Sequence, residues 1–470
     1  MHTPHVTLDL DQETVPIRLW PPGFSLLLAA FGYCGGSTTL GCLWLPRVSW
    51  LIAVPFATIL CRRLGTGKYS GPLVALTMTS DGLLNTTCYG LSDAPFFLLV
   101  LWSFLCFHRW TMHPERTRWL FWAGLLAGIS YGVRNVGLPL VAIVPAALWW
   151  NAWKNGEGHR RGMTCTLPWL YGAMPFVILL KLRNLLVFGT HEPYLMGPSQ
   201  IGLIGNFGWA GIALWEEFHI WPFLKEIFIV SRIRMLLSTA CPLLIGVGIA
   251  IKGWGSPQIS RRDRLFGVVI FGYVVLGWTM VLAARTLYEM GQPIRSRNAA
   301  LYTMYACGLL IVGIRNHRIF KRVLVDRLLI ACLCVLFLMR VEGLADLRTT
   351  PIQETFILHE DPIALNALRS IDKRDLLITD TPEIKILAEH PVRIIEPVGP
   401  KNAESFSEQF DVILNAADGR EVYFVAVGSR STPALDARDD LERHGIRLTP
   451  CFQNELLRIV RLDRLPPVNP

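Results

Sequence analysis

Residues 265–284 read LFGVVIFGYVVLGWTMVLAA, a run of twenty residues without one charged side chain. A transmembrane helix needs about 20 consecutive, mostly apolar residues to cross the hydrocarbon core of a bilayer. Other apolar segments of similar kind lie before residue 341, and several contain Gly or Pro, which membrane helices tolerate when they pack against neighbours. A shorter apolar segment, 23–33, precedes them. The predicted spans are 45–61, 71–87, 92–109, 118–133, 136–152, 164–187, 236–252, 264–284, 298–314 and 323–340.

The composition supports a polytopic α-helical membrane protein with about ten transmembrane helices. The 470 residues are 52% hydrophobic and only 17% charged, whereas soluble domains carry about 25% charged residues. This deficit of charge ends near Val341. We therefore expect a transmembrane domain over residues 1–341 and a soluble domain over 342–470.

The soluble part has the alternating pattern of a small α/β domain. Short strands are predicted at 375–379, 392–395, 421–427 and 455–462, and amphipathic helices are predicted between them at 382–388, 404–416 and 433–444. The segment contains no glycine-rich phosphate-binding motif, so no nucleotide site is expected there.

The net charge of +9 would suggest a nucleic-acid partner, but the distribution of the basic residues excludes this interpretation. Lys and Arg cluster in alternate short loops between the predicted spans, as the positive-inside rule requires of cytoplasmic loops. We therefore expect no nucleic-acid partner, a plasma (inner) membrane location, and an extracytoplasmic N-terminus and C-terminal domain. The basic clusters lie at 62–68, 109–118, 154–161, 252–264 and 315–322.

Several ionisable residues fall on the opposite, outer side, where Arg runs against the positive-inside bias. Moving a sugar from a lipid phosphate needs cations that hold the phosphate and a carboxylate that takes the proton of the acceptor hydroxyl. Arg suits phosphate because its planar fork donates two parallel hydrogen bonds. The candidates are Asp93, Arg134, Arg183, Glu289, Arg295 and Arg297, with Asp11 in the N-terminal tail.

Each candidate also has a structural interpretation. Asp93 follows Ser92 at the start of a predicted span and would serve equally as a helix N-cap. Arg134 and Arg183 would be explained by snorkelling to the membrane interface. The Trp-rich stretch 215–221 is typical of an interfacial helix, although its Glu and His residues leave a metal site as a less favoured alternative.

Five segments, taken together, resemble a known family. They are WPPGFSLLLA (20–29), YGLSDAP (89–95), AGLLAGISYGVRNVGL (123–138), LRNLLVFG (182–189) and IRSR (294–297). In order and spacing they resemble the bacterial GT-C glycosyltransferases, relatives of the protein mannosyltransferases and aminoarabinose transferases. The 89–95 segment has Asp where the family commonly has Glu, and 294–297 lacks the usual Tyr and Pro.

This resemblance implies an inverting transfer of a sugar from a polyprenyl-phosphate donor to a lipid, glycan or protein acceptor on the outer face. Asp93 would then line the outer cavity, and Arg134, Arg295 and Arg297 would bind the lipid phosphate. Arg183 and Glu289 are further candidates for substrate binding. Some members of the family use a divalent metal ion, and the cofactor of this chain stays open.

The family's catalytic Asp lies upstream of the Pro-Pro-Gly segment, which begins here only about twenty residues into the chain. We therefore expect the first transmembrane helix of the family to be missing, with Asp11 as a less favoured catalytic substitute. Two alternatives remain: a transporter or flippase of lipid-linked sugars, and a truncated, non-catalytic remnant of the family.

Overall fold

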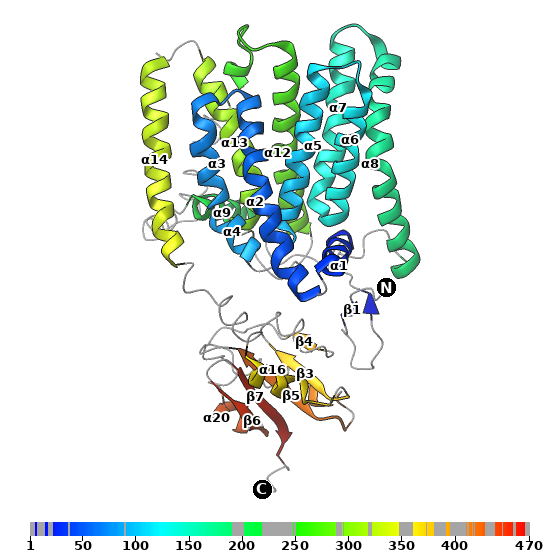
Figure 1. Cartoon of the computed structure of the whole chain (residues 1–470), viewed down its shortest axis with the longest axis vertical. Helices are drawn as coiled ribbons and strands as arrows, with labels where there is room; N and C mark the ends of the chain where they lie inside the picture. Colours follow the sequence, from blue (N-terminus) through cyan, green and yellow to red (C-terminus); the bar gives the residue numbers. More distant parts are fainter. Residues whose placement is uncertain are drawn as a thin grey trace. The chain divides into compact units, whose positions relative to one another are not determined.

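The computed structural model describes most of the chain, and its helices and strands are drawn in Figure 1. Two compact units are present: one comprises Arg18–Leu347, and the other comprises Met1–Ile17 together with Arg348–Pro470. The described residues are 5–6, 15–16, 22–35, 38–88, 91–189, 202–218, 248, 251–287, 294, 296–317, 322–346, 361–372, 374–379, 392–394, 410, 413–415, 417, 419–427, 438–443, 445–454 and 457–465.

The first unit is helical, and it confirms the predicted class of polytopic membrane protein. Six helical segments in the described part of the chain are long and apolar enough to cross a membrane. The predicted span 236–252 lies mostly outside the described residues. The elements are α1 (Gly23–Gly35), α2 (Thr38–Leu64), η1 (Gly67–Tyr69), α3 (Ser70–Met78), α4 (Asp81–Cys88), α5 (Asp93–Met112), α6 (Thr117–Val133), η2 (Asn135–Gly137), α7 (Leu138–Lys154), α8 (Gly158–Phe188), α9 (Leu203–Glu217), α12 (Arg261–Leu287), α13 (Ser296–Asn316) and α14 (Arg322–Asp346).

The predicted single span 71–87 is wrong, because α3 and α4 form two short helices. The nine residues of α3 cover only about 14 Å at 1.5 Å per residue, which is half of a membrane crossing. The chain leaves the helix at Thr79, and the Ser80 hydroxyl then accepts a hydrogen bond from the Leu83 backbone N–H at 3.2 Å. A new helix, α4, begins after this break, and its Gly82 packs directly against the first residues of α13.

Small residues hold α6 against α8. A Cβ atom added at Gly124 would lie 2.2 Å from the carbonyl oxygen of Trp169, and one at Gly128 would lie 2.6 Å from that of Ala173. The backbones therefore approach as closely as glycine permits, which is how small-xxx-small patterns stabilise helix pairs in membranes. Ser103 on α5 donates a hydrogen bond to the Ala123 carbonyl at 2.7 Å and ties a third helix to this pair.

The basic segments lie together at one end of the helical unit, called the basic end below. Contacts there join helix ends that are far apart in sequence: Lys68 Nζ with Asp326 Oδ2 at 2.8 Å, Arg315 Nη1 with the Gly65 carbonyl at 3.4 Å, and Arg262 Nη1 with the Met112 carbonyl at 3.4 Å. The other ends of the helices form the opposite end. There Gly23 packs on the backbone of Gly132, Gly82 packs on Ser296, and Asn206 Nδ2 donates to the Arg285 carbonyl at 3.1 Å.

The second unit contains a five-stranded mixed sheet, which confirms the predicted α/β class. The strand order is β4 (Val392–Ile394), β3 (Leu376–Thr379), β5 (Val422–Val427), β7 (Leu457–Arg464) and β6 (Ile446–Gln453). β3 runs parallel to β4 and β5, and β7 runs antiparallel to β5 and β6. Helices α16 (Pro362–Arg369) and α20 (Arg438–Arg443) accompany the sheet, and β1 (His5–Val6) pairs with β2 (Val15–Pro16).

The four predicted strands are present, whereas β6 and α16 are not among the predicted elements. β6 contains Pro450, which argues against a strand in sequence patterns, but β6 is an edge strand, where proline is tolerated. An irregularity in its pairing with β7 falls between Pro450 and Phe452. The predicted helix 382–388 lies outside the described residues.

Candidate active site

A buried ion pair lies at the opposite end of the helical unit, where α5 begins and α6 ends. Asp93 is the first residue of α5, and Arg134 follows the last residue of α6 in an extended conformation. Arg134 Nη1 contacts Asp93 Oδ2, and it also approaches the Ser92 hydroxyl at 3.5 Å. Asp93 is 1% exposed and Arg134 is 8% exposed. Each charge therefore depends on the other, since an unpaired charge at this depth is strongly unfavourable.

The structure contradicts the interpretation of Asp93 as a simple helix cap. Ser92 is the N-cap residue of α5, and neither carboxylate oxygen of Asp93 has a hydrogen-bond partner among the described residues, beyond the ionic contact of Oδ2 with Arg134. Oδ1 is therefore a buried acceptor without a donor from the described chain. Snorkelling is wrong for Arg134 too, because its guanidinium is buried against a carboxylate.

Three buried tyrosines lie near this ion pair. Tyr273 on α12 and Tyr302 and Tyr305 on α13 are each at most 1% exposed, and their hydroxyls have no hydrogen-bond partner in the described part of the chain. The ring centroids of Tyr273 lie 5.3 Å from Tyr302 and 5.7 Å from Tyr305. The Arg134 guanidinium is close enough to Tyr273 and Tyr302 to interact with them electrostatically. Tyr273 and Tyr302 thus add two potential hydrogen-bond donors near Arg134.

The aromatic cluster connects the tyrosines to the helix that carries Asp93. Phe97, one turn after Asp93 on α5, lies 5.9 Å from Tyr305. Phe104, on the same helix, lies 5.4 Å from Tyr273 and 5.3 Å from Tyr305. The Tyr302 ring packs on Gly277, where an added Cβ would lie 2.4 Å from the ring. Close packing of α5, α12 and α13 therefore fixes the positions of the phenols.

Four of the five family-like segments meet at this end of the unit. Gly23 of the 20–29 segment would place a Cβ 2.4 Å from the carbonyl oxygen of Gly132, two residues before Arg134. Asp93 belongs to the 89–95 segment, and Arg134 to 123–138. The fourth segment, 294–297, begins α13, and Gly82 packs on its Ser296. Segments up to 274 residues apart in sequence thus converge around the ion pair.

The other predicted residues have different outcomes. Arg297 is half-buried in the first turn of α13, which places it about 8 Å and 12 Å along the helix axis from Tyr302 and Tyr305 at 1.5 Å per residue. Arg183, near the end of α8, donates a hydrogen bond to Asn184 Oδ1 at 3.0 Å. No contact that we resolve joins Arg183 to the ion pair. Asp11, Glu289 and Arg295 lie outside the described residues.

The tyrosines are absent from the sequence-based candidates, although a signal for them exists. Tyr302 and Tyr305 have the i, i+3 spacing of one helix face, and Tyr273 lies in the middle of an uncharged span. Three phenols placed deep inside membrane helices need hydrogen-bond partners. That requirement, rather than any motif, marks them as candidates.

The segment 215–221 is only partly described. Trp215, Glu216 and Glu217 form the last turn of α9, and Glu217 is 1% exposed. Among the residues described, no three His, Cys, Asp or Glu side chains come together to hold a metal ion.

Comparisons with known proteins give distant structural neighbours. No protein-family model and no curated protein sequence matches the chain. The solved structures that it resembles include ArnT from Cupriavidus metallidurans bound to undecaprenyl phosphate, at 10% identity and a TM-score of 0.43, covering 95% of this chain and 88% of that one. They also include the apo oligosaccharyltransferase of Archaeoglobus fulgidus, at 10% identity and a TM-score of 0.48, covering 88% of this chain.

A third neighbour is the oligosaccharyltransferase AglB from Archaeoglobus fulgidus in complex with an inhibitory peptide and a dolichol-phosphate, at 10% identity and a TM-score of 0.47. The present chain covers 62% of the apo archaeal protein and 67% of the complexed one. At this level of identity the function has to be argued from the residues of the chain itself.

Proposed function

We propose that this protein transfers a sugar from a polyprenyl-phosphate donor to an acceptor hydroxyl at the extracytoplasmic face of the membrane. The observation that carries the proposal is the buried carboxylate of Asp93, with one oxygen against Arg134 and the other without a partner in the described chain. A protein keeps such a group at a cost of about 1–3 kcal/mol. Unsatisfied polar groups of this kind are concentrated where a substrate binds.

The site contains both hydrogen-bond donors and a hydrogen-bond acceptor, and this reaction requires both. A phosphate offers only acceptor oxygens, and the Arg134 guanidinium and the hydroxyls of Tyr273 and Tyr302 offer donors. The acceptor substrate brings a hydroxyl whose proton must be removed, and Asp93 Oδ1 is an acceptor placed beside those donors. Cations and phenols would therefore hold the leaving phosphate, while Asp93 acts on the acceptor as general base.

In the proposed step, the acceptor oxygen attacks the anomeric carbon of the sugar. The bond from that carbon to the phosphate oxygen breaks with its electron pair, so that polyprenyl phosphate leaves and the configuration inverts. Asp93 receives the proton of the acceptor hydroxyl. Arg134 would balance the charge that grows on the phosphate, since charge-assisted contacts of guanidinium with phosphate are about twice as strong as neutral ones. Arg295 and Arg297 are proposed as further phosphate ligands.

The side of the membrane follows from the charges. The basic end contains the Lys- and Arg-rich loops, and the positive-inside rule supports a cytoplasmic location for it. The site is at the opposite end and therefore extracytoplasmic in this proposal. We also propose that α14, which starts at the basic end where Asp326 binds Lys68, crosses the membrane and that the C-terminal domain is extracytoplasmic.

The test is an in vitro transfer assay with purified protein in liposomes and polyprenyl-phosphate-linked sugars as donors, with and without added Mg²⁺ or Mn²⁺. Asp93→Asn retains the shape of the side chain but cannot take a proton. We expect it to lower transfer by at least about a hundredfold, the contribution typical of a general base, while binding of undecaprenyl phosphate persists. Asp326→Asn, at the basic end, is the matched control and should transfer normally.

Two outcomes of this assay contradict the proposal. One is undiminished transfer by Asp93→Asn, because the carboxylate would then have no role in the chemistry. The other is movement of the lipid-linked sugar across the bilayer without transfer of the sugar to an acceptor, which would favour a flippase. Retention of folded protein is checked by size-exclusion chromatography for both variants, so that a loss of activity is not a loss of fold.

A further inference from the structure

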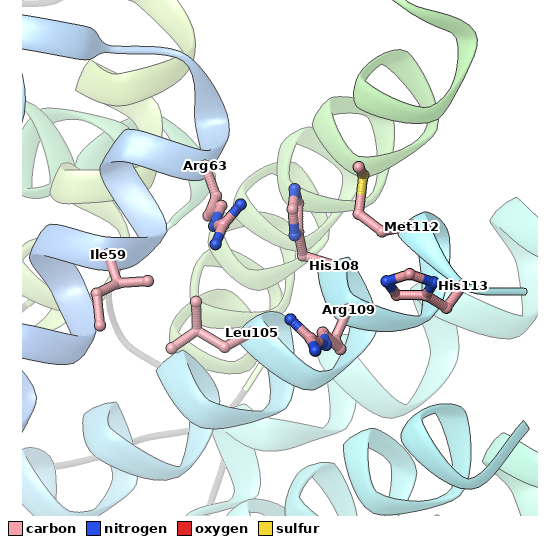
Figure 2. Close-up of a pocket in the computed structure, with 7 residues that line it drawn as sticks. All are labelled: Ile59, Arg63, Leu105, His108, Arg109, Met112 and His113. Carbon is pink, nitrogen blue, oxygen red and sulfur yellow. The ribbon is translucent and has the colours of Figure 1, made fainter. Parts of the chain in front are cut away.

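A second polar site lies at the basic end, far from the ion pair of Asp93. A pocket of about 270 Å³ opens between the end of α2 and the end of α5. Figure 2 shows two cationic and two imidazole side chains around it, with apolar side chains beside them. Asp93 and Arg109 are sixteen residues apart on α5, or about 24 Å at 1.5 Å per residue. The lining residues are Ile59, Arg63, Leu105, His108, Arg109, Met112 and His113.

The charges of this pocket are all positive or neutral. Arg63 and Arg109 form no ion pair with any described residue, although the Arg109 guanidinium lies 5.9 Å from the Trp119 ring. Among the described residues, His113 is the only lining residue within ion-pair distance of a carboxylate, with Glu115 Oε1 at 3.6 Å. Asp263 acts on His108 from the side of α12, but its carboxylate already accepts a hydrogen bond from Ser260 at 2.7 Å. The pocket is therefore suited to an anion.

Apolar side chains lead from the pocket along both helices. Ile52, Phe56 and Ile59 precede Arg63 on α2 at intervals of four, three and four residues, which places them on one helix face. On α5, Trp102 and Leu105 precede Arg109 with the same geometry. Phe56 and Trp102 meet across the two helices at 5.8 Å. The side chains of Ile52, Ile59 and Trp102 are 43%, 46% and 47% exposed, so the face they form is uncovered in the described structure.

We propose that this pocket binds the phosphate headgroup of an anionic membrane lipid, with the lipid chains lying on the apolar face of α2 and α5. A soluble phosphate would satisfy the arginines but would leave the adjoining apolar face unused. A lipid phosphate satisfies both, because its charged headgroup can lie in the pocket while its acyl chains lie on the adjoining apolar face. Juxtamembrane basic residues attract anionic lipids by about 1 kcal/mol each, and the pocket adds direct contacts to that attraction.

This proposal goes beyond the proposed function and does not depend on it. The lipid site is at the other end of α5 from Asp93, and a lipid bound there takes no part in the transfer. Failure of one proposal therefore leaves the other intact, because lipid binding and sugar transfer are measured separately.

The test is native mass spectrometry of the full-length protein in detergent, titrated with phosphatidylglycerol or phosphatidylcholine. The test variant is Arg63→Gln with Arg109→Gln. The matched control is Arg62→Gln with Arg118→Gln, which removes the same charge from exposed arginines in the last turn of α2 and the first turn of α6 that do not line the pocket. We expect the test variant to bind phosphatidylglycerol at least about tenfold more weakly, since each lost charge-assisted contact accounts for roughly that factor, and the control to bind normally.

Inorganic phosphate and glycerol phosphate separate the lipid from a soluble phosphate. We expect neither, at millimolar concentration, to displace phosphatidylglycerol from the unmodified protein. Displacement by inorganic phosphate, equal affinity for phosphatidylcholine, or equal weakening in the test and control variants would each overturn the proposal.

The apolar half of the site has its own test. Ile59→Trp adds bulk at an exposed position of the lining and should weaken binding of phosphatidylglycerol without affecting the fold. Leu179→Trp is the control, because Leu179 is 61% exposed on α8 and does not line the pocket. Weakening of the same size in both would show that the added indole acts on the bilayer rather than on this pocket.

Discussion

Replacing Arg134 by Gln tests how strongly the buried ion pair is coupled. The carboxylate of Asp93 is 1% exposed and the Arg134 side chain is 9% exposed, so neither charge is substantially solvated once its partner is removed. Removing one member of a buried pair costs about 3–5 kcal/mol. We expect Arg134→Gln to lower the free energy of unfolding by this amount. Asp93→Asn should cost less, because the remaining guanidinium still has an amide oxygen beside it.

The double variant Asp93→Asn, Arg134→Gln measures the coupling energy between the two residues. With no charge left in the site, its loss of stability should be smaller than the sum of the two single losses, and the coupling energy should be at least about 1.5 kcal/mol in a double-mutant cycle. Reversible unfolding in mixed detergent–denaturant micelles, followed by tryptophan fluorescence, supplies the three differences. An additive cycle would refute the argument that Asp93 depends on Arg134.

The exposed pair Lys68–Asp326 provides a matched comparison. Its N–O distance is 2.8 Å, but the side chains are 53% and 26% exposed. Solvent screens such a pair, and exposed pairs typically contribute about 0–1 kcal/mol. The cycle on Lys68→Gln and Asp326→Asn should therefore give a coupling energy several times smaller than that of the buried pair. Equal values would mean that burial does not set the strength of the pair at Asp93.

Three further predictions concern other parts of the chain. Gly124→Leu should abolish most folded protein in fluorescence size-exclusion chromatography, because its Cβ would lie 2.2 Å from the Trp169 carbonyl; Gly132→Leu, with no atom within 4 Å of its Cβ, is the control. Tyr302→Phe should change the free energy of unfolding by less than about 0.5 kcal/mol, because it removes a hydroxyl without a partner in the described chain, yet it should weaken binding of undecaprenyl phosphate in a scintillation assay. Asp361→Ala should raise amide exchange of α16 about fivefold, because Asp361 Oδ1 accepts hydrogen bonds from the backbone of Ile363 and Ala364 at 2.9 and 3.2 Å and an N-cap contributes about 1 kcal/mol.

The membrane architecture follows from hydropathy because a helix in lipid must be long and apolar along its whole length. That signal predicts α5, α6, α12 and α13 to within a few residues. It fails at 71–87, where α3 ends at Met78 and α4 begins at Asp81. The break serves the packing of α4 against α13, which is a contact between residues more than 200 positions apart. A pattern read along one segment contains no information about such a contact.

For the site too, the sequence identifies single residues but not the contacts between them. Asp93 and Arg134 are each recognisable in sequence as ionisable residues at the ends of apolar spans. Their pairing cannot be recognised in the sequence, because it depends on the start of α5 and the end of α6 lying together in the folded bundle. Gly124 and Gly128 of the 123–138 segment bring α6 against α8, and Arg134 directly follows α6.

The ion pair that stabilises the fold also limits the proposed chemistry. While Arg134 binds Asp93, this contact occupies a donor of the guanidinium that the phosphate needs. The bound phosphate must therefore draw part of the guanidinium toward itself, which Arg permits because its fork has several N–H donors. Once this happens, the carboxylate loses a contact with the guanidinium and is available to the acceptor hydroxyl. Donor binding would thus make Asp93 available to the acceptor. Arg134→Lys, whose ammonium is a single point charge, should therefore retain a larger share of the free energy of unfolding than of the transfer rate.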